Sequence, residues 1–280
     1  MRVSLTPDPR RGVFETMLVV DGVPVELDAH LERLAASLRT LYGGELPSDA
    51  ADQVREEAGD LEHGKLRITI TACLVDLVAH GATKSTRANE AEFEMQVTTA
   101  AVDPAAVFPG PERGVALRSF RVPGGLGEHK WADRRLLERT ESKLSPGELP
   151  LLVDGDGNAL EASRASLFVV VDGLLATPPA DGRILPGIAR RRTIETARDA
   201  GIDVDEKPLP LASLRGHEVF LAGSVRGIEH VLALDRKALS PAGALSRRIA
   251  ADLRRRWLPV AQGESAAVLA GGRRGGRPSR

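Results

Sequence analysis

Apolar residues near the start of the chain follow first a strand pattern and then a helical one. The segment VFETMLVVDGVPVEL (13–27) predicts two strands joined at Asp21-Gly22, a dipeptide typical of a two-residue hairpin turn. The next segment predicts a helix with Asp28 as its N-cap and an end before Gly43-Gly44. The helix has an apolar stripe of Leu31, Leu34, Ala35, Leu38 and Leu41, and a polar stripe of His30, Arg33 and Ser37.

The rest of the chain alternates between strand-like and helix-like segments, and no internal repeat interrupts the alternation. Asp-Gly pairs separate several apolar runs between 149 and 179, as in hairpins. We expect strands at 65–79, 92–102, 114–122, within 149–179 and at 217–231, where a small-residue turn ends the strand. We expect helices after the loop that carries Lys130, at 185–201 and at 241–257.

A proline-rich stretch divides the chain. Three prolines and a glycine lie between Val102 and Arg113, a composition typical of a connection between domains. We therefore expect an N-terminal α+β domain over 1–103, a linker over 104–112 and a C-terminal α+β domain over 113–258. The Gly-, Ala- and Arg-rich end, 259–280, is expected to be a disordered tail.

Composition restricts the class of protein. With 280 residues, 42% hydrophobic residues and a net charge of −1, the chain is typical of a soluble globular protein without bulk attraction to nucleic acid or membrane. The single cysteine, Cys73, excludes an intrachain disulfide and is in keeping with a reducing cytoplasm. No apolar run reaches membrane-spanning length, and the start lacks the apolar core of a signal peptide. We expect a cytoplasmic protein.

Several residues that can carry chemistry lie at the ends of predicted elements. Lys130 follows a glycine-rich loop, Glu161 closes a strand, and Arg33 lies on the polar stripe of the first helix. The helix that opens at GIARR (187–191) has free backbone N–H groups at its start, a natural anion site, and AGS (222–224) is a second small-residue turn. Each feature alone is typical of an ordinary surface. Together they suggest a phosphorylated cofactor held as a Schiff base.

These residues lie within motifs that resemble the class IV aminotransferases, the pyridoxal-phosphate enzymes of fold type IV. That family includes branched-chain and D-amino acid aminotransferases and aminodeoxychorismate lyase. The opening block GVFETMLVVDGVPVELDAHLERLAAS (12–37) is similar to the family's Phe-Glu-Thr and His-x-x-Arg-Leu pattern. The segments EASRASLFVVVDGLLATPPADGRILPGIAR (161–190) and EVFLAGSVRGIEHV (218–231) resemble two further blocks. The resemblance runs from about Gly12 to about Trp257 and implies a two-domain α+β fold.

The resemblance also implies roles for individual residues. Lys130 would form the Schiff base with pyridoxal 5′-phosphate and later carry the substrate proton, while the glycine loop lets it swing and Trp131 and the following helix hold its base. Glu161 would face the pyridine nitrogen and keep it protonated. Arg33 would bind the cofactor phosphate. The phosphate would also accept hydrogen bonds from the backbone N–H groups of Ile188 and Ala189. Ser224 and the Val225 amide would complete this phosphate-binding cup.

Some positions depart from the family pattern. Ser166 stands where an Asn is common, and Ala189 where many members have a Thr, so that only the backbone amide remains for the phosphate. The sole tyrosine, Tyr42, ends the first helix and is not expected to replace the family's tyrosine near the cofactor. Near Lys130, either His129 tunes the amine or it has no role, and Asp133 and Arg134 are interpreted as an ion pair that holds the helix.

Three readings of the reaction remain open. SVRGIEHV (224–231) and the His-Lys…Arg-Arg context of Lys130 favour an aminodeoxychorismate lyase that releases pyruvate and 4-aminobenzoate, with Arg226 at a substrate carboxylate or in a structural ion pair. The alternative is a transaminase for an amino acid and a 2-oxo acid. The third is a family member without catalytic activity, and Ala189 and the missing tyrosine are the features that favour it.

The resemblance further implies a homodimer. We expect a small-molecule substrate, no metal, no nucleic acid and no membrane.

Overall fold

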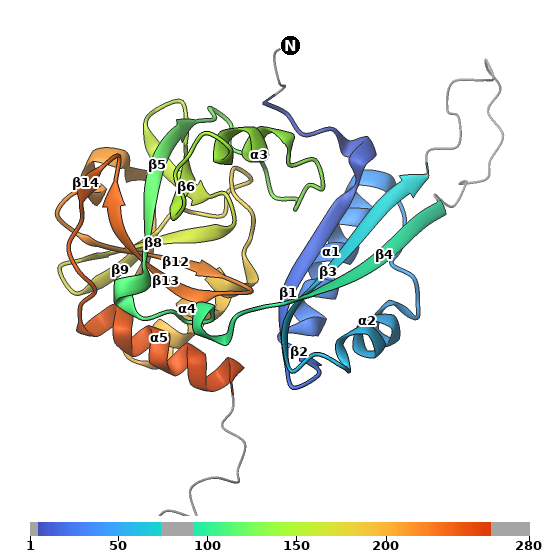
Figure 1. Ribbon diagram of the computed structural model, residues 1–280. Helices are drawn as coiled ribbons and strands as arrows, with labels where there is room; N and C mark the ends of the chain where they lie inside the picture. Colours follow the sequence, from blue (N-terminus) through green and yellow to red (C-terminus); the bar gives the residue numbers. More distant parts are fainter. Residues whose placement is uncertain (1–4, 74–91, 259–280) are drawn as a thin grey trace, which may run out of the picture.

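Two sheets organise the chain, one in each half (Figure 1). The structure is a computed structural model that describes residues 5–73 and 92–258. The first sheet has four strands in the order β2-β1-β3-β4, and the second has ten. The chain passes from β4 to β5 through two 3₁₀ turns, Pro104–Ala106 and Pro111–Arg113. Val107 and Phe108 between these turns are buried among apolar residues of the second half. The α+β class predicted from the sequence is confirmed.

The first half is a small sheet covered by two helices. Asp21 and Gly22 form the predicted turn between β1 and β2, and their φ angles of 48° and 75° are those of a type I′ hairpin. Leu34 and Leu38 of the predicted apolar stripe are buried against Met17 of β1. The elements are β1 (Val13–Val20), β2 (Val23–Pro24), α1 (Leu27–Tyr42), α2 (Ala50–Ala58), β3 (His63–Cys73) and β4 (Glu92–Ala101), after a 3₁₀ turn at Pro9–Arg11.

The start of α1 differs from the prediction. Its N-cap is Glu26, in the left-handed region at φ 59°, and Asp28 lies in the first turn of the helix instead. The Glu26 carboxylate accepts a hydrogen bond of 2.8 Å from Nε of Arg192, far along the chain. Long-range ion pairing therefore decides the helix start, and a local propensity for Asp at the N-cap does not reveal it.

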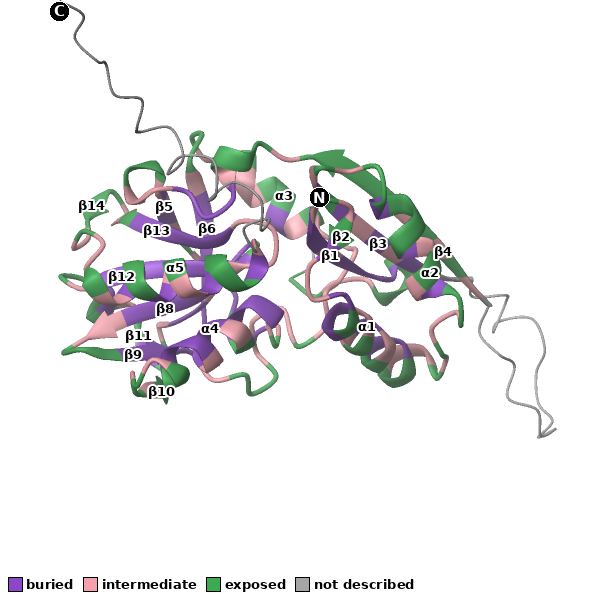
Figure 2. Cartoon of the chain, turned by 90° about the horizontal axis from the view of Figure 1, so that it is seen from below, coloured by how far each residue is buried: buried purple, intermediate pink, exposed green. Residues whose placement is uncertain are grey.

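The larger sheet closes on itself. Along the order β8-β12-β13-β5-β6-β7, each strand pairs with the next, and β7 pairs again with β8. A six-stranded barrel results, and buried Leu, Val and Ala residues of its strands form one core cluster. Much of the ribbon of these strands has the colour of buried residues in Figure 2. The strands are β5 (Val115–Arg121), β6 (Glu148–Val153), β7 (Asn158–Ala162), β8 (Ala165–Val171), β9 (Leu174–Thr177), β10 (Val204–Glu206), β11 (Leu209–Pro210), β12 (Glu218–Gly223), β13 (Gly227–Leu234) and β14 (Lys237–Ala238). The helices are α3 (Arg135–Glu141), α4 (Ile188–Asp199) and α5 (Ala244–Trp257), with a 3₁₀ turn at Leu211–Leu214.

Two further predictions about elements need correction. The segment 217–231 forms most of a hairpin, β12 and β13, rather than one strand, because the chain reverses at residues 224–226. Helix α3 begins only at Arg135, so it does not directly follow Trp131, which instead forms a β-bridge with Val13. The ends of two predictions, 74–79 of the third strand and the tail 259–280, lie outside the described residues.

Strand β1 joins the two halves. Strand β2 pairs only with the last two residues of β1, which leaves an open edge for the second half. At that edge the Phe14 N–H donates to the Lys130 carbonyl at 2.9 Å, and the Leu18 N–H donates to the Ser224 carbonyl at 3.2 Å. The Ala132 N–H donates back to the carbonyl of Gly12 at 3.0 Å. The edge of β1 thus binds, through backbone hydrogen bonds, the loop of Lys130 and the turn of Ser224, both predicted from the sequence to lie at the site.

Candidate active site

A cavity of about 400 Å³ lies between the two halves of the molecule, within the usual size range of small-molecule sites. Side chains of β1, α1 and β3 form one wall, and loops of the second half form the other. Every site residue predicted from the sequence lines it: Arg33, Lys130, Glu161, Ile188, Ala189, Ser224, Val225 and Arg226. Folding therefore gathers into one place residues that are up to 193 positions apart, from Arg33 to Arg226.

Lys130 is held at its backbone and free at its side chain. Its carbonyl is fixed by β1, and the indole of Trp131 donates to the Leu126 carbonyl at 3.0 Å. Of the glycines in the preceding loop, Gly125 is closely packed, since a Cβ there would come within 1.9 Å of the Arg183 carbonyl, whereas a Cβ on Gly124 would meet nothing within 4 Å. That the loop lets the lysine swing stays a prediction. In the structure, Nζ of Lys130 lies 4.9 Å from the centre of the Phe14 ring.

Burial lowers the pKa of Lys130 to about 8. Glu15 and Glu161 oppose this change, and Arg33 and Arg134 add to it. An ammonium group loses its proton more easily where water is excluded, so near neutral pH more of the Lys130 amine is unprotonated and available as nucleophile and base than in a surface lysine.

Glu161 lies in β7 opposite Ser166 of β8, at the narrow hairpin between these strands. Both its carboxylate oxygens are within 3.3–3.4 Å of the Leu185 backbone N–H. Burial raises the pKa of Glu161 to about 7, although the Leu185 hydrogen bond and the charge of Lys130 act in the opposite direction. A carboxyl group with this pKa is ready to share a proton with a ring nitrogen.

Arg33 reaches from α1 to the start of α4. Its NH1 group donates to the carbonyl of Pro186 at 2.8 Å, and Pro186 precedes Gly187, the N-cap of α4. The first backbone N–H groups of a helix have no acceptor within it, and Ile188 and Ala189 bring theirs to the cavity wall. The guanidinium and the helix start together make a site for a dianion.

Gly187 is required by the packing at this helix start. A Cβ at this position would lie 2.6 Å from the Ser166 hydroxyl and 3.2 Å from Cβ of Arg190. The backbone of the N-cap therefore approaches Ser166 as closely as a glycine allows. The turn that carries Ser224 and Val225, between β12 and β13, lines the same cavity and closes the cup.

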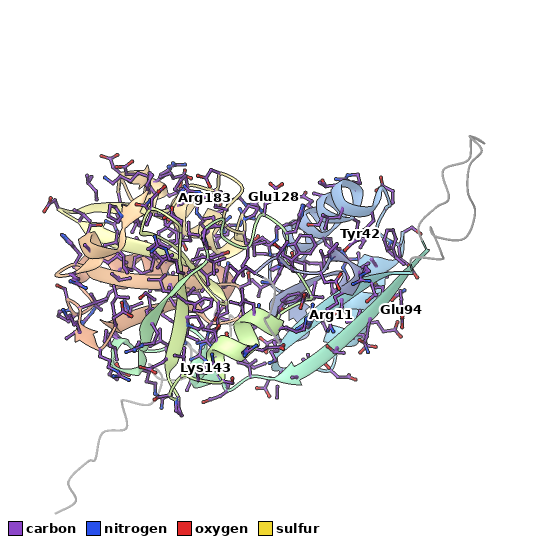
Figure 3. All side chains as sticks on the ribbon, turned by 90° about the horizontal axis from the view of Figure 1, so that it is seen from above. Arg11, Tyr42, Glu94, Glu128, Lys143 and Arg183 are labelled. Atoms are coloured by element: carbon purple, nitrogen blue, oxygen red, sulfur yellow. The ribbon has the colours of Figure 1, made fainter. Side chains whose placement is uncertain are left out.

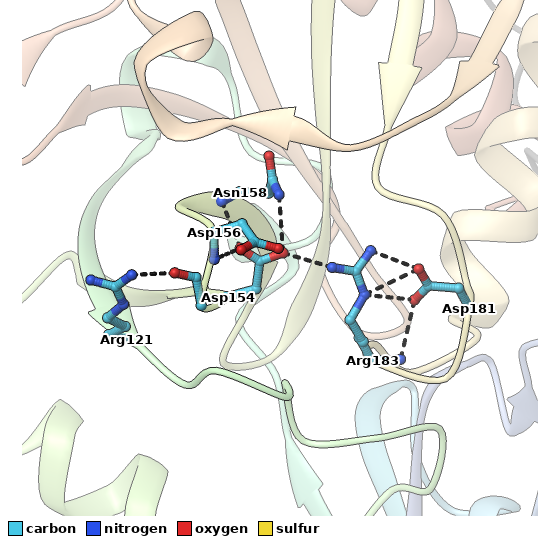
Figure 4. A network of polar contacts seen from close by, with 7 residues as sticks. Arg121, Asp154, Asp156, Asn158, Asp181 and Arg183 are labelled. Carbon is cyan, nitrogen blue, oxygen red and sulfur yellow. Dashed lines mark hydrogen bonds and ion pairs between the residues drawn. The ribbon is translucent and has the colours of Figure 1, made fainter.

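The loop that leads to α4 is anchored by the polar network of Figure 4. Asp154, buried in the turn after β6, accepts hydrogen bonds from the backbone N–H groups of Asp156 and Asn158. Its other oxygen accepts from NH1 of Arg183 at 2.6 Å, and Arg183 pairs with Asp181 as well. This network holds the loop whose next residues include Leu185 and Pro186, the partners of Glu161 and Arg33.

Arg226 takes part in an ion-pair cluster and also lines the cavity. Its Nε donates to the Glu229 carboxylate at 2.6 Å, and Arg164 pairs with the same carboxylate at 3.2 Å. Glu229 is buried, whereas about a third of the Arg226 side chain is exposed. The two readings of Arg226 from the sequence are therefore compatible, since one edge of the guanidinium is paired and the residue still faces the cavity.

Three arginines of the cavity wall were not predicted as site residues: Arg67, Arg134 and Arg164. The guanidinium carbon of Arg67 lies 3.8 Å from the centre of the Phe14 ring, and that of Arg134 lies 5.9 Å from it. Burial, followed by the charge of Arg134, lowers the pKa of Arg67. The sequence carried a signal, because Lys65, Arg67 and Thr69 alternate with buried apolar residues along β3.

Other predictions around Lys130 have mixed outcomes. Asp133 pairs with Arg135 at 2.7 Å and not with Arg134, which reaches the Ser163 carbonyl instead. His129 lines the cavity, and its Nδ1 is 3.0 Å from the Ser37 hydroxyl on the polar stripe of α1. Tyr42, labelled in Figure 3, donates its hydroxyl to the Pro9 carbonyl at the outer end of α1.

Fold and site together define a two-domain enzyme whose cavity combines a buried lysine, a carboxyl group and an anion cup. The chain belongs to the class IV aminotransferases, whose family pattern matches residues 12–234. A putative branched-chain-amino-acid aminotransferase of Methanocaldococcus jannaschii is 25% identical over 88% of both chains. The 4-amino-4-deoxychorismate lyase of Pseudomonas aeruginosa is 26% identical, with a TM-score of 0.69 over 92% of this chain and 96% of that one. A putative lyase of the same kind from Legionella pneumophila has a TM-score of 0.72 at 22% identity, over 88% and 91%.

The cofactor of this family is pyridoxal 5′-phosphate, and the chain is a pyridoxal-phosphate-dependent lyase or transaminase. The residues present fit such a group. The N-cap of α4 is Gly187, which has no side chain to cap the first backbone N–H groups of the helix, and this helix start lines the same cavity as Lys130 and Glu161. Among residues 5–73 and 92–258, no group of His, Cys, Asp and Glu is arranged to hold a metal ion.

Proposed function

We propose that this protein is a lyase that converts 4-amino-4-deoxychorismate into 4-aminobenzoate and pyruvate. The observation that carries the proposal is the cationic lining of the cavity on its substrate side. Arg67 and Arg134 surround the Phe14 ring, and Arg226 stands at another part of the wall. The proposed substrate has two carboxylates, one on the ring and one on the enolpyruvyl group, and each needs a cationic partner.

Each residue of the site has a task in this reaction. The cofactor, when bound, supplies an electron sink for the carbon that bears the substrate amine. Lys130 removes the proton from that carbon, for which its lowered pKa suits it. The bond between the neighbouring carbon and the enolpyruvyl oxygen would then break with the electron pair on the oxygen, and the released enolate would take up one proton on its terminal carbon to become pyruvate. Glu161 holds a proton at the pyridine nitrogen.

The cup for the cofactor phosphate would consist of Arg33, the backbone N–H groups of Ile188 and Ala189, and the Ser224-Val225 turn. Arg33 supplies a fixed fork of donors, and the helix start supplies backbone N–H groups that have no acceptor within the helix. The loss of a threonine hydroxyl at Ala189 leaves these donors in place. Arg226 would meet a substrate carboxylate with the edge of its guanidinium that Glu229 does not occupy.

The second candidate is a transaminase that acts on an amino acid and a 2-oxo acid. The putative aminotransferase of Methanocaldococcus jannaschii supports it. The same arginines would suit a dicarboxylic 2-oxo acid, whereas a branched apolar side chain would bring no carboxylate to Arg67 and Arg134. Both reactions begin with proton removal by Lys130. They differ in whether a leaving group departs from the neighbouring carbon or water enters.

A product assay separates the candidates. The purified, cofactor-loaded protein is given 4-amino-4-deoxychorismate, and pyruvate is measured by coupled oxidation of NADH. Stoichiometric pyruvate and 4-aminobenzoate are expected. Absence of pyruvate, together with amino transfer from glutamate to a 2-oxo acid, would rule out the lyase in favour of the transaminase. A protein that stays colourless with added cofactor and turns over neither substrate would point to a member without catalysis.

We also propose that the protein works as a cytoplasmic homodimer. Its membership of the family supports the dimer, and its single cysteine supports a reducing compartment. In the described ranges, no helix is both long and apolar enough to cross a membrane. Light scattering coupled to size exclusion should give twice the chain mass of 29.9 kDa, and a mass of one chain at micromolar concentration would contradict the dimer.

A further inference from the structure

Glu15 is a buried carboxylate to which the reaction above gives no task. It lies on β1, on the face that packs Val13, Met17 and Val19 against α1, and only 1% of its surface is exposed. A charge among apolar side chains is costly unless it is fully paired. The structure therefore has to supply partners for Glu15, and these partners indicate what the residue does.

Both partners of Glu15 come from one face of α1. Arg33 donates through Nε to Oε1 at 2.8 Å and through NH2 to Oε2 at 2.7 Å, a bidentate pair. His30, one turn earlier, places Nδ1 2.7 Å from Oε2. Two parallel hydrogen bonds fix the plane of the Arg33 guanidinium, which a single bond would leave free to rotate. The edge that remains is NH1, which contacts Pro186 at the start of α4.

We propose that Glu15 is a positioning residue for the cofactor phosphate: it holds the Arg33 guanidinium in one plane, with NH1 directed toward the N-terminus of α4. The proposal rests on the proposed role of Arg33 at the phosphate. His30 supports the same arrangement by contacting Oε2 of Glu15, the oxygen that also accepts from NH2 of Arg33. Sequence separation hides this link, because Glu15 and Arg33 belong to different elements and neither faces the other until β1 and α1 pack.

The charges of this network also act on Lys130. Burial alone would raise the pKa of Glu15, but Arg33 and His30 outweigh it and lower the pKa to about 2, so the carboxylate stays ionised. Burial lowers the pKa of Lys130, and Glu15 is the strongest opposing influence. Removal of the Glu15 charge leaves Arg33 uncompensated and should lower the pKa of Lys130 further. A purely structural role would not produce this change.

The test compares two aldehydes that differ only in the phosphate. Wild type, Glu15→Gln, Arg33→Ala and the double variant are titrated, as apoproteins, with pyridoxal 5′-phosphate and with pyridoxal, and the visible absorption band is followed. Glu15→Gln should weaken binding of the phosphorylated aldehyde on the order of tenfold to a hundredfold, and binding of pyridoxal by much less. The double variant should bind no more weakly than Arg33→Ala. Glu32→Gln, on the exposed side of α1, is the matched control.

A second readout follows the amine of Lys130 directly. Labelling of Lys130 with an amine reagent, measured by peptide mass spectrometry across pH, should show a lower apparent pKa in Glu15→Gln than in wild type. Equal losses for both aldehydes, additive losses in the double variant, or an unchanged labelling profile would each overturn the proposal.

A third variant covers the case in which Glu15→Gln does not fold. Glu15→Asp keeps the charge, but its side chain is too short for both hydrogen bonds to Arg33, so it should weaken binding of pyridoxal 5′-phosphate more than binding of pyridoxal. An equal loss of affinity for both aldehydes would again contradict the proposal. A wild-type protein without a band for either aldehyde would instead contradict the role of Lys130.

Discussion

Two side chains in the cavity have pKa values close to neutrality. Burial lowers the pKa of Lys130 to about 8 and raises that of Glu161 to about 7. In water the two groups would differ by roughly six pKa units and would both be ionised near pH 7. Within the cavity each can gain or lose a proton at physiological pH, which is the property required of a base and of a proton partner for a ring nitrogen.

Replacement of Lys130 by Ala should abolish the visible band with pyridoxal 5′-phosphate and reduce turnover by about 10³-fold or more, because both the covalent link and the base are lost. Absorption spectra and a product assay measure the two effects. Lys143→Ala, at an exposed lysine labelled in Figure 3, should leave both unchanged. A normal band in the Lys130→Ala protein would mean that another amine forms the link.

Arg67→Ala should raise KM for a dicarboxylic substrate about 10- to 100-fold, because a charge-assisted hydrogen bond to a carboxylate is lost. Affinity for the cofactor should change little, since Arg67 lies beside Phe14 and away from the start of α4. Arg39→Ala, at an exposed arginine of α1, serves as the control. Steady-state kinetics decide the matter, and an unchanged KM would remove Arg67 from the substrate site.

At the scale of elements, the site depends on how closely two backbones approach. The N-cap of α4 touches the Ser166 side chain of β8, and β1 fixes the loops of Lys130 and Ser224 through backbone hydrogen bonds. The sequence predicted the strands and the helix separately. Their contacts depend on the closed barrel and on the open edge of β1, which periodicity does not describe.

Gly187→Ala should weaken binding of pyridoxal 5′-phosphate about tenfold, because the added methyl group overlaps the Ser166 hydroxyl and displaces the start of α4. Ser166→Ala in the same chain should restore part of the lost affinity, because it removes the hydroxyl oxygen that the added methyl group overlaps. Gly124→Ala, where a Cβ meets nothing within 4 Å, is the control. This prediction is wrong if the double variant binds pyridoxal 5′-phosphate as weakly as Gly187→Ala alone.

At the scale of the whole molecule, buried histidines connect stability to pH. His230 lies in the barrel wall, 4% exposed, and burial lowers its pKa below the ordinary value of 6.5, as it does for His30. The unfolded chain then binds protons at a higher pH than the folded one. These residues contribute stability that is present above about pH 6.5 and lost as the pH falls below that value.

The contribution of His230 to the free energy of unfolding should therefore fall below about pH 6.5, whereas Glu161, whose pKa is raised to about 7, acts in the opposite direction. The change in the free energy of unfolding per pH unit should be less positive in His230→Gln than in wild type. Urea unfolding at several pH values measures the change in the free energy of unfolding with pH. This change can be compared between proteins even if the variant is less stable at pH 7.5. His217→Gln, at a histidine that is not buried, should keep the wild-type slope. Identical slopes in all three proteins would show that His230 does not titrate between the folded and unfolded states.

The sequence by itself determined the local features of this protein. The Asp21-Gly22 turn, the apolar stripe of α1 and the helix after Gly187 follow from residue types at short range, where backbone geometry and periodicity act. The same holds for the motif residues Lys130, Glu161 and Arg33, which family resemblance marked and folding brought to one cavity.

The tertiary structure alone decided what depends on contacts between distant segments. It selected Glu26 over Asp28 as the helix cap through Arg192, paired Asp133 with Arg135, and brought Arg67 and Arg134 to one phenyl ring. It also tied Glu15 to Arg33. Hydrogen bonds and ion pairs of this kind form only after β1, α1 and the barrel have packed, so no short stretch of sequence contains them.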